Sequence, residues 1–449
     1  TGIQKPYPLT GAILSLDILP VKAHQKKDVP IPAHQHYNVT YGIIADQKET
    51  LRIQPDENTA VQWIPVEQLP EICKEPHMLP VYEKVIHRMR RWKAMQEQAL
   101  LQTAQPLLAW YPLHARDLPW RHTQEPYRIW LSEIMLQQTR VEAVKPYFAR
   151  FIQELPDVAA LAAAPEERIV KLWEGLGYYS RVRNMQKAAI QVMEEYDGRI
   201  PEDFETLLSL KGIGRYTAGA IASIAYGKKV PAVDGNVLRV YTRLTENHED
   251  IMKQSVRKAV ENELTERMPK DRPGDFNQAM MELGAVVCVP NGTAKCEECP
   301  LGEFCLARKH GTVEELPVKA PKKARTIEQR TILVIQDGAS TAIRKRPDTG
   351  LLAGLYELPN VEGHLTKKAA LAQVKDMGLE PLRIEALPDA KHIFSHIEWR
   401  MCAYRIAVSS LEEAPREKFL FADKRESAEK YAIPSAFRAY TRYMKEENT

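Results

Sequence analysis

The sequence has no long apolar run and no strong excess of charge of either sign. Its longest nearly unbroken apolar stretch, 218–226, is about half of the ~18 residues that a membrane-spanning helix needs. Asp17 and several prolines lie within the first 20 residues, so these do not resemble a signal peptide. With 62 Lys and Arg against 59 Asp and Glu, the net charge of +3 does not by itself indicate a nucleic-acid partner. The composition therefore predicts globular domains and excludes a membrane-spanning protein.

Cysteine is also scarce, with six residues in 449. Four of them lie close together in the sequence, separated by seven, two and five residues: Cys288, Cys296, Cys299 and Cys305. A secreted disulfide scaffold distributes many cysteines along a short chain, so a local quartet in a long chain predicts a metal site in the reducing cytoplasm. Four thiolates at such spacing fit an iron–sulfur cluster or zinc. We favour a cubane cluster, and zinc or four unliganded buried thiols remain the alternatives.

The length predicts about three domains, and the composition changes accordingly along the chain. Residues 1–95 contain short strand-like stretches, 96–310 have helical periodicity, 311–330 form a basic connector and 331–449 return to strand patterns. We therefore expect a multidomain protein with an all-α core between two α+β domains. One continuous helix, Val81–Tyr111, is expected to lead into the core. Further helices are expected over 128–140, 142–154, 166–175, 180–196, 202–210, 216–226, 235–244, 254–268 and 275–288.

A short segment with two glycines lies between two of these helical stretches. Residues 210–217 read Leu-Lys-Gly-Ile-Gly-Arg-Tyr-Thr, in which the glycines are Gly212 and Gly214. Glycine permits a tight hairpin whose backbone N–H groups point outward and can bind a phosphate. A simple helix–helix turn is the alternative reading.

Two carboxylates are expected to lie in opposite environments. Asp234 directly precedes a helical pattern, and an aspartate at a helix N-cap accepts backbone hydrogen bonds and should stay ionised. Glu133 lies in the apolar stretch 129–136, where burial would raise its pKa and keep it protonated. Cleavage of a glycosidic bond uses such a pair, an acid and an anion beside a cationic sugar. Taken singly, Asp234 could be only a helix cap and Glu133 only a surface residue.

Together these motifs resemble the MutY-type adenine DNA glycosylases, a family within the endonuclease III-like helix-hairpin-helix superfamily. The resemblance covers residues 105–445, about three quarters of the chain. It rests on the hairpin, the cysteine quartet and five further segments: 118–121, 132–139, 173–181, 232–237 and 276–281.

The resemblance implies hydrolysis of the N-glycosidic bond of adenine mispaired with 8-oxoguanine, after the adenosine has flipped out of the duplex. It implies that Glu133 protonates the adenine and that Asp234 stabilises the oxocarbenium sugar, supported by Tyr216 and Asn236. Other residues are implied to line the adenine pocket or to enter the duplex: Trp120, Arg121, Leu136 and Gln278 for the pocket, Gln138 and Tyr178 for the duplex. It also implies one [4Fe-4S] cluster, although the family usually has six residues between its first two cysteines.

Tyr216 distinguishes two chemistries of the superfamily. Bifunctional relatives have a lysine at this position, which forms a Schiff base and cuts the strand, and a phenol cannot form that imine. Lys211 lies in the hairpin, at a position that the family pattern does not use for catalysis. We therefore predict a monofunctional glycosylase.

The last region, 331–449, resembles the MutT-like Nudix-fold recognition domain of these enzymes. Its marker is the stretch 343–359, but the glutamate-rich helix of the hydrolases is replaced by 360–368, so hydrolysis is not expected. The resemblance implies that Phe394, Ser395 and His396 contact 8-oxoguanine. A strand end with a hydrogen-bonded histidine is the alternative for this triplet.

Residues 1–95 resemble the second half of another Nudix domain. Gly2-Ile3 matches the end of a Nudix box, and 34–37, 56–58 and 61–65 match later segments. The chain begins at Thr1 rather than Met, which suggests processing or a fragment, and either a natural fusion or a truncated reading frame would explain the segment. His34 and His36 could bind a metal, but a strand face is the favoured reading.

The expected partner is double-stranded DNA with an adenine:8-oxoguanine mismatch, bound by a bacterial, nucleoid-associated monomer. The sequence opposes three rival functions. An endonuclease III-like lyase acting on oxidised pyrimidines is opposed by Tyr216 and the C-terminal domain. A lesion-binding protein without turnover is opposed by Glu133 and Asp234. A nucleotide-pool hydrolase would need the missing glutamate helix.

Overall fold

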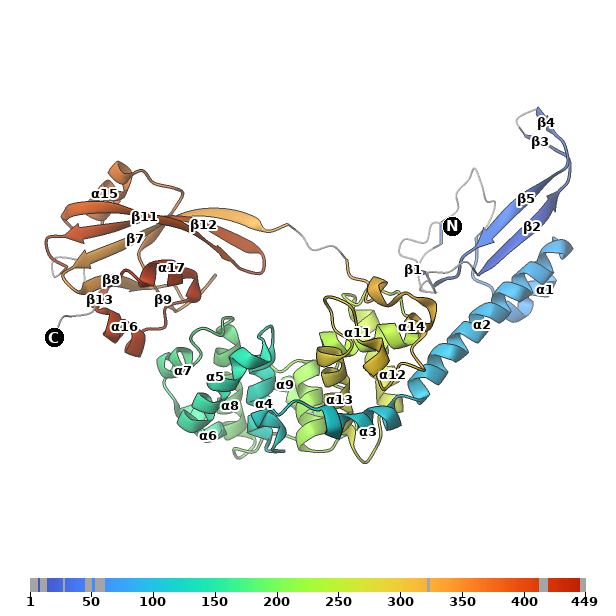
Figure 1. Cartoon of the computed structure of the whole chain (residues 1–449), viewed down its shortest axis with the longest axis horizontal. Coiled ribbons are helices and arrows are strands. Elements are labelled where there is room, and N and C mark those ends of the chain that lie inside the picture. The colour runs from blue at the N-terminus through green and yellow to red at the C-terminus, as the bar shows by residue number, and fades with distance from the viewer. Residues whose placement is uncertain are drawn as a thin grey trace. The chain divides into compact units, whose positions relative to one another are not determined.

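The computed structural model describes residues 7–8, 14–26, 29–44, 51–52, 61–320, 324–411 and 419–444. The chain forms two compact units, each made of two stretches of sequence. The first unit contains residues 1–117 and 215–320, and the second contains 118–214 and 321–449. Within the described part of the chain, no helix has the length and apolar character required to cross a membrane. The predicted multidomain fold, with a helical core and a C-terminal α+β domain, is confirmed (Figure 1).

The helical part of the first unit packs around α11 (Gly235–Thr245), nine of whose eleven residues are buried. Its main apolar cluster joins α3 (Ala104–His114), α11, α12 (Gln254–Arg267) and α13 (Pro273–Val286) through residues such as Leu107, Leu238, Val260 and Leu283. The other helical elements of this unit are α1 (Leu69–Ile72), α2 (Leu79–Leu101), α10 (Arg215–Ala220), the π-helical turn Ile221–Ala225 and α14 (Leu306–His310).

The predicted continuous helix Val81–Tyr111 is wrong in one respect, because the helix stops at Leu101 and a new one starts at Ala104. Thr103 lies at the break and donates its side-chain hydroxyl to the carbonyl oxygen of Ala99 at 3.1 Å. A threonine hydroxyl that binds the carbonyl four residues earlier competes with the backbone hydrogen bonds of the helix, which accounts for the interruption.

The helices of the second unit follow the predicted order. They are α4 (Pro126–Leu136), α5 (Val141–Glu154), α6 (Val158–Ala163), α7 (Glu166–Leu172), α8 (Ser180–Glu195) and α9 (Phe204–Ser209). The short α6 was not predicted. Its start is fixed by Asp157, whose side chain accepts a hydrogen bond from the backbone N–H of Ala160 at 2.8 Å.

The C-terminal domain is built on a seven-stranded sheet with the order β11-β12-β7-β8-β13, in which β10 also pairs with β7 and β9 with β8. The long strands β7 (Thr326–Asp337) and β12 (Ile397–Val408) are parallel, and β11 (Pro381–Ile393) is antiparallel to β12. The shorter strands are β8 (Ser340–Lys345), β9 (Tyr356–Glu357), β10 (Asn360–Glu362) and β13 (Leu420–Ala422).

Alternate residues of β7 enter two separate apolar clusters, one on each face of the sheet. Ile332 packs with Phe437 and Tyr440, next to and within α17 (Arg438–Thr441). Leu333 packs with Ala370 and Val374 of α15 (Lys367–Asp376). Helices thus cover both faces of the sheet (Figure 1), because β7 carries apolar side chains in both directions. A further helix, α16 (Lys424–Lys430), precedes α17.

The N-terminal region contains strands, as predicted, in three two-stranded pairs among its described residues. They are β1 (Tyr7–Pro8) with β6 (Ile43–Ile44), β2 (Ser15–Val21) with β5 (His34–Thr40), and β3 (His24–Lys26) with β4 (Val29–Ile31). His34 and His36 lie on exposed β5, with their Nε2 atoms 2.9 Å apart. The Nudix-like motifs at Gly2-Ile3 and 56–58 lie outside the described residues.

Candidate active site

Glu133 lies on α4, whose start is well defined. Glu125 caps the helix and accepts hydrogen bonds from the N–H groups of Tyr127 and Arg128 at 3.0 and 2.8 Å, and Pro126 occupies the first turn. From this start the apolar stretch 129–135 is directed into the core. The Glu133 side chain is carried with it and is only 6% exposed, so the predicted burial is confirmed.

Of the residues expected to line the adenine pocket or to enter the duplex, Trp120, Leu136 and Gln138 lie near the two ends of α4. Trp120 is buried in the turn Pro119–Arg121 and packs edge-to-face on Phe148, with 5.4 Å between the ring centroids. Leu136 is the last helical residue, and Gln138 follows it, exposed and with a φ of 56°. Tyr178 is also exposed and has a φ of 48°. The second unit therefore contains these residues together with Arg121 and Glu133.

The predicted hairpin connects α9 to α10. Gly212 has a φ of 81°, and a Cβ added there would lie 2.7 Å from the Cβ of Asn184. A Cβ added at Gly214 would have no heavy atom within 4 Å. The two glycines therefore differ: Gly212 is required by the turn itself, whereas Gly214 leaves open backbone on an exposed surface.

Asp234 is the N-cap of α11, as predicted. Its Oδ1 accepts the backbone N–H groups of Asn236 and Val237, both at 2.8 Å, and its Oδ2 accepts the side-chain amide of Asn236 at 2.7 Å. Desolvation nevertheless raises the pKa of Asp234 above its ordinary value, and these hydrogen bonds only oppose the rise. The expectation that the cap alone keeps this carboxylate ionised is thus incomplete, because burial acts in the opposite direction.

Arg239, which no sequence motif singles out, links Asp234 to the cysteine segment. One turn beyond Asn236, its guanidinium donates to Asn236 Oδ1 at 2.8 Å, to the carbonyl of Gly284 at 2.7 Å and to the carbonyl of Cys288 at 2.7 Å. Gly284 allows this approach, since an added Cβ would lie 2.6 Å from the Cβ of Asn236. The only signal in the sequence was an arginine three residues after Asn236, and its partners at Gly284 and Cys288 lie about 45 residues or more away in the chain.

α13 holds the segment before Asp234 in place through Asn277. Asn277 accepts the N–H of Ala232 at 3.0 Å and donates to the carbonyl of Val230 at 2.9 Å.

Two further site residues contact the same region. On α13, Gln278 accepts a hydrogen bond from the Tyr111 hydroxyl at 3.0 Å. The Tyr216 hydroxyl lies 3.7 Å from the sulfur of Met281. The first unit thus contains Tyr216, Asp234, Asn236 and Gln278.

The four clustered cysteines are unpaired thiols that line one cavity with Arg243 and Arg308. Among the described residues, no carboxylate or imidazole lines that cavity, so its donor set is entirely sulfur. Burial raises the pKa of Cys299 to about 12 and that of Cys305 to about 11, and the neighbouring thiols add to the rise. In the described part of the chain, no three His, Cys, Asp or Glu side chains are arranged to bind one metal ion. The donor chemistry fits an all-cysteine group, and the geometry does not form a single-ion site.

In the C-terminal domain, Phe394, Ser395 and His396 form the turn between β11 and β12. The Phe394 N–H donates to the carbonyl of Ile397 at 2.8 Å and closes this turn. The Phe394 ring packs edge-to-face on Trp399, with 5.0 Å between the ring centroids. The turn is therefore held both by its own backbone and by a buried aromatic residue of β12.

The polar residues of this turn face a cavity. Ser395 and His396 are exposed, and the Ser395 hydroxyl lies 2.7 Å from that of Tyr178. Tyr178, Phe394, Ser395 and His396 line one cavity of about 800 Å³. The structure thus brings the predicted triplet together with one of the two residues expected to enter the duplex.

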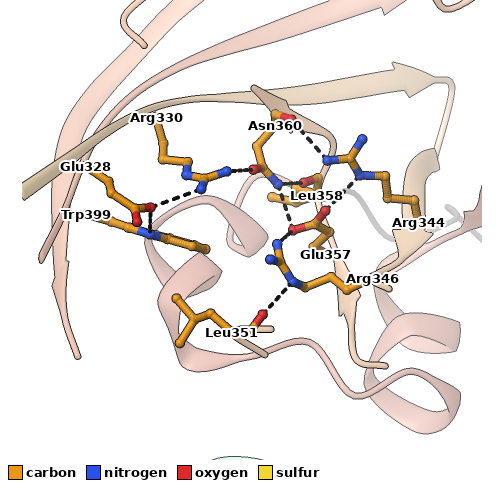
Figure 2. Close-up of polar contacts among 9 residues, drawn as sticks. All are labelled: Glu328, Arg330, Arg344, Arg346, Leu351, Glu357, Leu358, Asn360 and Trp399. Carbon is orange, nitrogen blue, oxygen red and sulfur yellow. Dashed lines mark hydrogen bonds and ion pairs between the residues drawn. The ribbon is translucent and has the colours of Figure 1, made fainter. Parts of the chain in front are cut away.

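A buried ionic network lies near Trp399, the residue on which the Phe394 ring packs (Figure 2). Glu357 is 2% exposed and pairs with Arg344, at 2.7 Å, and with Arg346, while Asn360 donates to it at 2.8 Å. The Arg346 guanidinium also lies 5.9 Å from the centre of the Trp399 ring, whose other neighbours include Arg330 at 4.9 Å. The network thus connects β8 and β9 to the aromatic residue on which Phe394 rests.

Two family models match the chain. A model described as "HhH-GPD superfamily base excision DNA repair protein" matches residues 131–269, and one described as "NUDIX domain" matches 330–443. The second match lies almost entirely within the predicted C-terminal domain.

Among characterised proteins, the chain is similar to adenine DNA glycosylases. It is 38% identical to that of Mus musculus over 369 residues, which are 69% of this chain and 70% of the mouse protein. It is 36% identical to that of Homo sapiens, with 67% and 66% covered, and 33% identical to one from Buchnera aphidicola, with 65% and 83% covered. A solved structure of a thermostable thymine-DNA glycosylase aligns with a TM-score of 0.43 and 29% identity, over 49% of this chain and 99% of that one. The chain belongs to the adenine DNA glycosylase family.

Proposed function

We propose that this base-excision repair enzyme removes adenine mispaired with 8-oxoguanine, by hydrolysis of the N-glycosidic bond without strand cleavage. The observation that carries the proposal is the contrast between two carboxylates. Glu133 lies on the buried side of α4 and is 6% exposed, and Asp234 is held by three hydrogen bonds at the start of α11. Such a pair suits an acid that protonates the leaving base and an anion that stabilises a cationic sugar.

In this mechanism Glu133 protonates the adenine, and Asp234 faces the positive charge that develops on the sugar. Asn236 orients the Asp234 carboxylate through its side-chain amide, and Tyr216 supports the same site. Trp120, Arg121, Leu136 and Gln278 would surround the flipped base. Because Tyr216 has no amine, the intermediate is released to water rather than trapped as an imine.

Single-turnover cleavage of a labelled duplex with adenine opposite 8-oxoguanine tests this function. We expect strand breaks only after alkali treatment. Glu133→Gln should slow excision by at least about 100-fold, the usual contribution of a general acid, and should still bind the duplex. Glu142→Gln, on the exposed face of α5, is the matched control and should cleave normally. Breaks without alkali would instead indicate a lyase and would point to Lys211.

Phe394, Ser395 and His396 are proposed to read the 8-oxoguanine. The exposed hydroxyl and imidazole lie at the tip of a turn that the Trp399 packing holds in shape. Ser395→Ala combined with His396→Ala should lower the preference for 8-oxoguanine over guanine by about tenfold, the worth of one or two lost hydrogen bonds. His364→Ala, in the same domain, should leave this ratio unchanged. An unaltered ratio in the double variant would contradict the assignment.

The cysteine quartet is proposed to hold one [4Fe-4S] cluster. The support is the family membership together with a cavity that is lined by four thiols and, among the described residues, by no other metal-binding side chain. Cys288, Cys296, Cys299 and Cys305 would supply the thiolates, and Arg243, which donates to the sulfur of Cys288 at 3.3 Å, would offset their charge. The group is assigned a structural role, since it would fix a segment with little apolar content.

The proposed domains follow the changes in composition along the chain. Residues 96–310 are assigned to the glycosylase core, 311–330 to the connector and 331–449 to the recognition domain, while 1–95 are a separate Nudix-like segment. The exposed backbone of the hairpin at Gly212 and Gly214 would bind a DNA phosphate. Gln138 and Tyr178 would enter the duplex beside the flipped adenosine.

A further inference from the structure

The guanidinium of Arg181 binds five backbone carbonyls from two segments, 134–138 at the end of α4 and 176–178 before α8, called here the two loops. Its Nη1 donates to the carbonyl oxygens of Ile134, Met135 and Gln137 at 2.8, 3.2 and 2.5 Å. Its Nη2 donates to those of Leu176 and Gly177 at 3.1 and 3.0 Å. Arginine suits this role because its five donors lie in one rigid plane, whereas a lysine ammonium is a single point.

Each of the two loops ends on an exposed residue with a left-handed backbone. The first set of carbonyls closes the C-terminal end of α4, and Gln138 follows with a φ of 56°. The second set closes the turn before Tyr178, which has a φ of 48°. Neither residue is a glycine, so this conformation is strained and persists only where the surroundings impose it. The Arg181 side chain contacts both loops.

The stability of α8 does not explain this position. Arg181 is the second residue of α8, and a cation at a helix N-terminus is opposed by the helix dipole. Burial lowers the pKa of Arg181 to about 10, so the side chain still carries its charge at neutral pH. Its Nε is buried and has no hydrogen-bond partner among the described residues. The rings of Trp173 and Tyr178 flank the guanidinium, with its Cζ at 5.2 and 5.6 Å from their centres.

We propose that Arg181 is a positioning residue that sets Gln138 and Tyr178 in the geometry needed to extrude the adenosine. It does not touch the reacting atoms. It fixes the end of α4 just before Gln138 and, through the same guanidinium, the turn just before Tyr178. The inference rests on the proposed role of Gln138 and Tyr178 in the duplex.

A double-mutant cycle on the full-length protein tests the positioning role. Arg181→Gln should slow single-turnover excision by about 100-fold, as expected when reacting groups are displaced by about 1 Å. In a background that already carries Gln138→Ala and Tyr178→Ala, the same change should slow excision less than about threefold, because the residues that it positions are gone. An equal effect in both backgrounds would overturn the proposal, since a purely structural residue acts regardless of its neighbours.

Two further variants keep this test interpretable. Arg150→Gln is the matched control, because Arg150 also donates to a carbonyl, that of Leu172 at 3.0 Å, and lies 4.8 Å over the ring of Tyr147. It should change the rate by less than about twofold. If Arg181→Gln fails to fold, Arg181→Lys takes its place in the cycle. This variant retains the charge but not the planar fork, and it too should be slow only when Gln138 and Tyr178 are present.

Amide hydrogen exchange in the free protein tests the same inference without DNA or activity. Arg181→Gln should speed exchange at Thr139 and Leu176, whose N–H groups donate to Leu136 and Trp173 within the two loops. The Ile213 amide, which donates to Leu210 in the hairpin, is the internal control. Unchanged exchange at both loop amides would overturn the positioning role. If Arg181→Gln speeds exchange at these amides but the wild-type protein does not excise adenine, the positioning role stands and only the proposed function is rejected.

Discussion

At the scale of single residues, Asp234 shows how two opposing effects set the state of one carboxylate. Burial raises its pKa, and the hydrogen bonds from Val237 and Asn236 lower it. The N-cap role could be predicted from the position before a helical pattern. The degree of burial could not, because it depends on α13, which approaches from elsewhere in the chain.

The pH dependence of excision follows from this balance. If Asp234 acts as an anion, activity is present above its pKa and is lost as the pH falls through it, and the raised pKa places this loss above the range of an exposed aspartate. Asn236→Ala removes a hydrogen bond that favours the ionised form, so the acid limb should move to higher pH. Single-turnover rates across pH measure this. Asn247→Ala, just beyond the opposite end of α11, should leave the limb in place, and an unmoved limb in Asn236→Ala would exclude the proposed coupling.

Arg239 and Asn277 mark the limit of prediction at this scale. Both lie in predicted helices, and the segment that contains Asn277 belongs to a recognised motif. Their partners, at Cys288, Gly284, Ala232 and elsewhere, become visible only after α11 and α13 have packed together. A sequence pattern indicates the face of a helix on which a side chain lies, not which distant carbonyl it meets.

At the scale of elements, the helices of the core were predictable because proline, glycine and capping residues separate them. The nine predicted helical segments of the middle region each match an observed element, with ends that differ by a few residues. The errors occur where a local contact overrides the periodicity, at Thr103, or where the element is very short, at α6. The predicted helix 128–140 stops at Leu136, where Arg181 takes up the terminal carbonyls.

The hairpin between α9 and α10 gives a matched pair of glycine substitutions. Gly212→Ala should lower the free energy of unfolding by about 2 kcal/mol, because a left-handed backbone is costly for alanine and the new Cβ would meet Asn184 at 2.7 Å. Gly214→Ala should change it by less than about 0.5 kcal/mol, since that Cβ would enter open space. Urea unfolding of the two variants measures the difference. Equal losses would mean that the turn does not require the conformation seen at Gly212.

At the scale of the whole molecule, the cysteine segment is packed against the core of the first unit. Cys288 and Cys305 pack against the apolar cluster of α11 and α13, and Arg243 of α11 bonds both Cys288 Sγ and the carbonyl of Leu316. The spacing of the cysteines predicts that the bound group is an iron–sulfur cluster or a zinc ion. It does not decide between them, because both accept four thiolates.

Metal analysis of the purified protein distinguishes an iron–sulfur cluster from zinc. We expect about four iron and four sulfide ions per chain and a brown colour, and a colourless protein with one zinc would contradict the cluster. Cys299→Ser should lower the iron content and destabilise the protein, because the segment loses a bound group that ties it to α11. Cys402→Ser, in the C-terminal domain, should leave the metal content unchanged. Thermal unfolding and iron determination on the same samples measure both effects.

The close approach at Gly284 has a consequence for interpreting genetic variation in this protein. Position 284 has no functional group, and nothing in its chemistry would mark it in a survey of substitutions. Yet any side chain there would be built into the space that Asn236 occupies, 2.6 Å from its Cβ. A substitution at this position should therefore reduce activity as severely as one at Asp234. A method that ranks substitutions only by the functional groups they remove would overlook it.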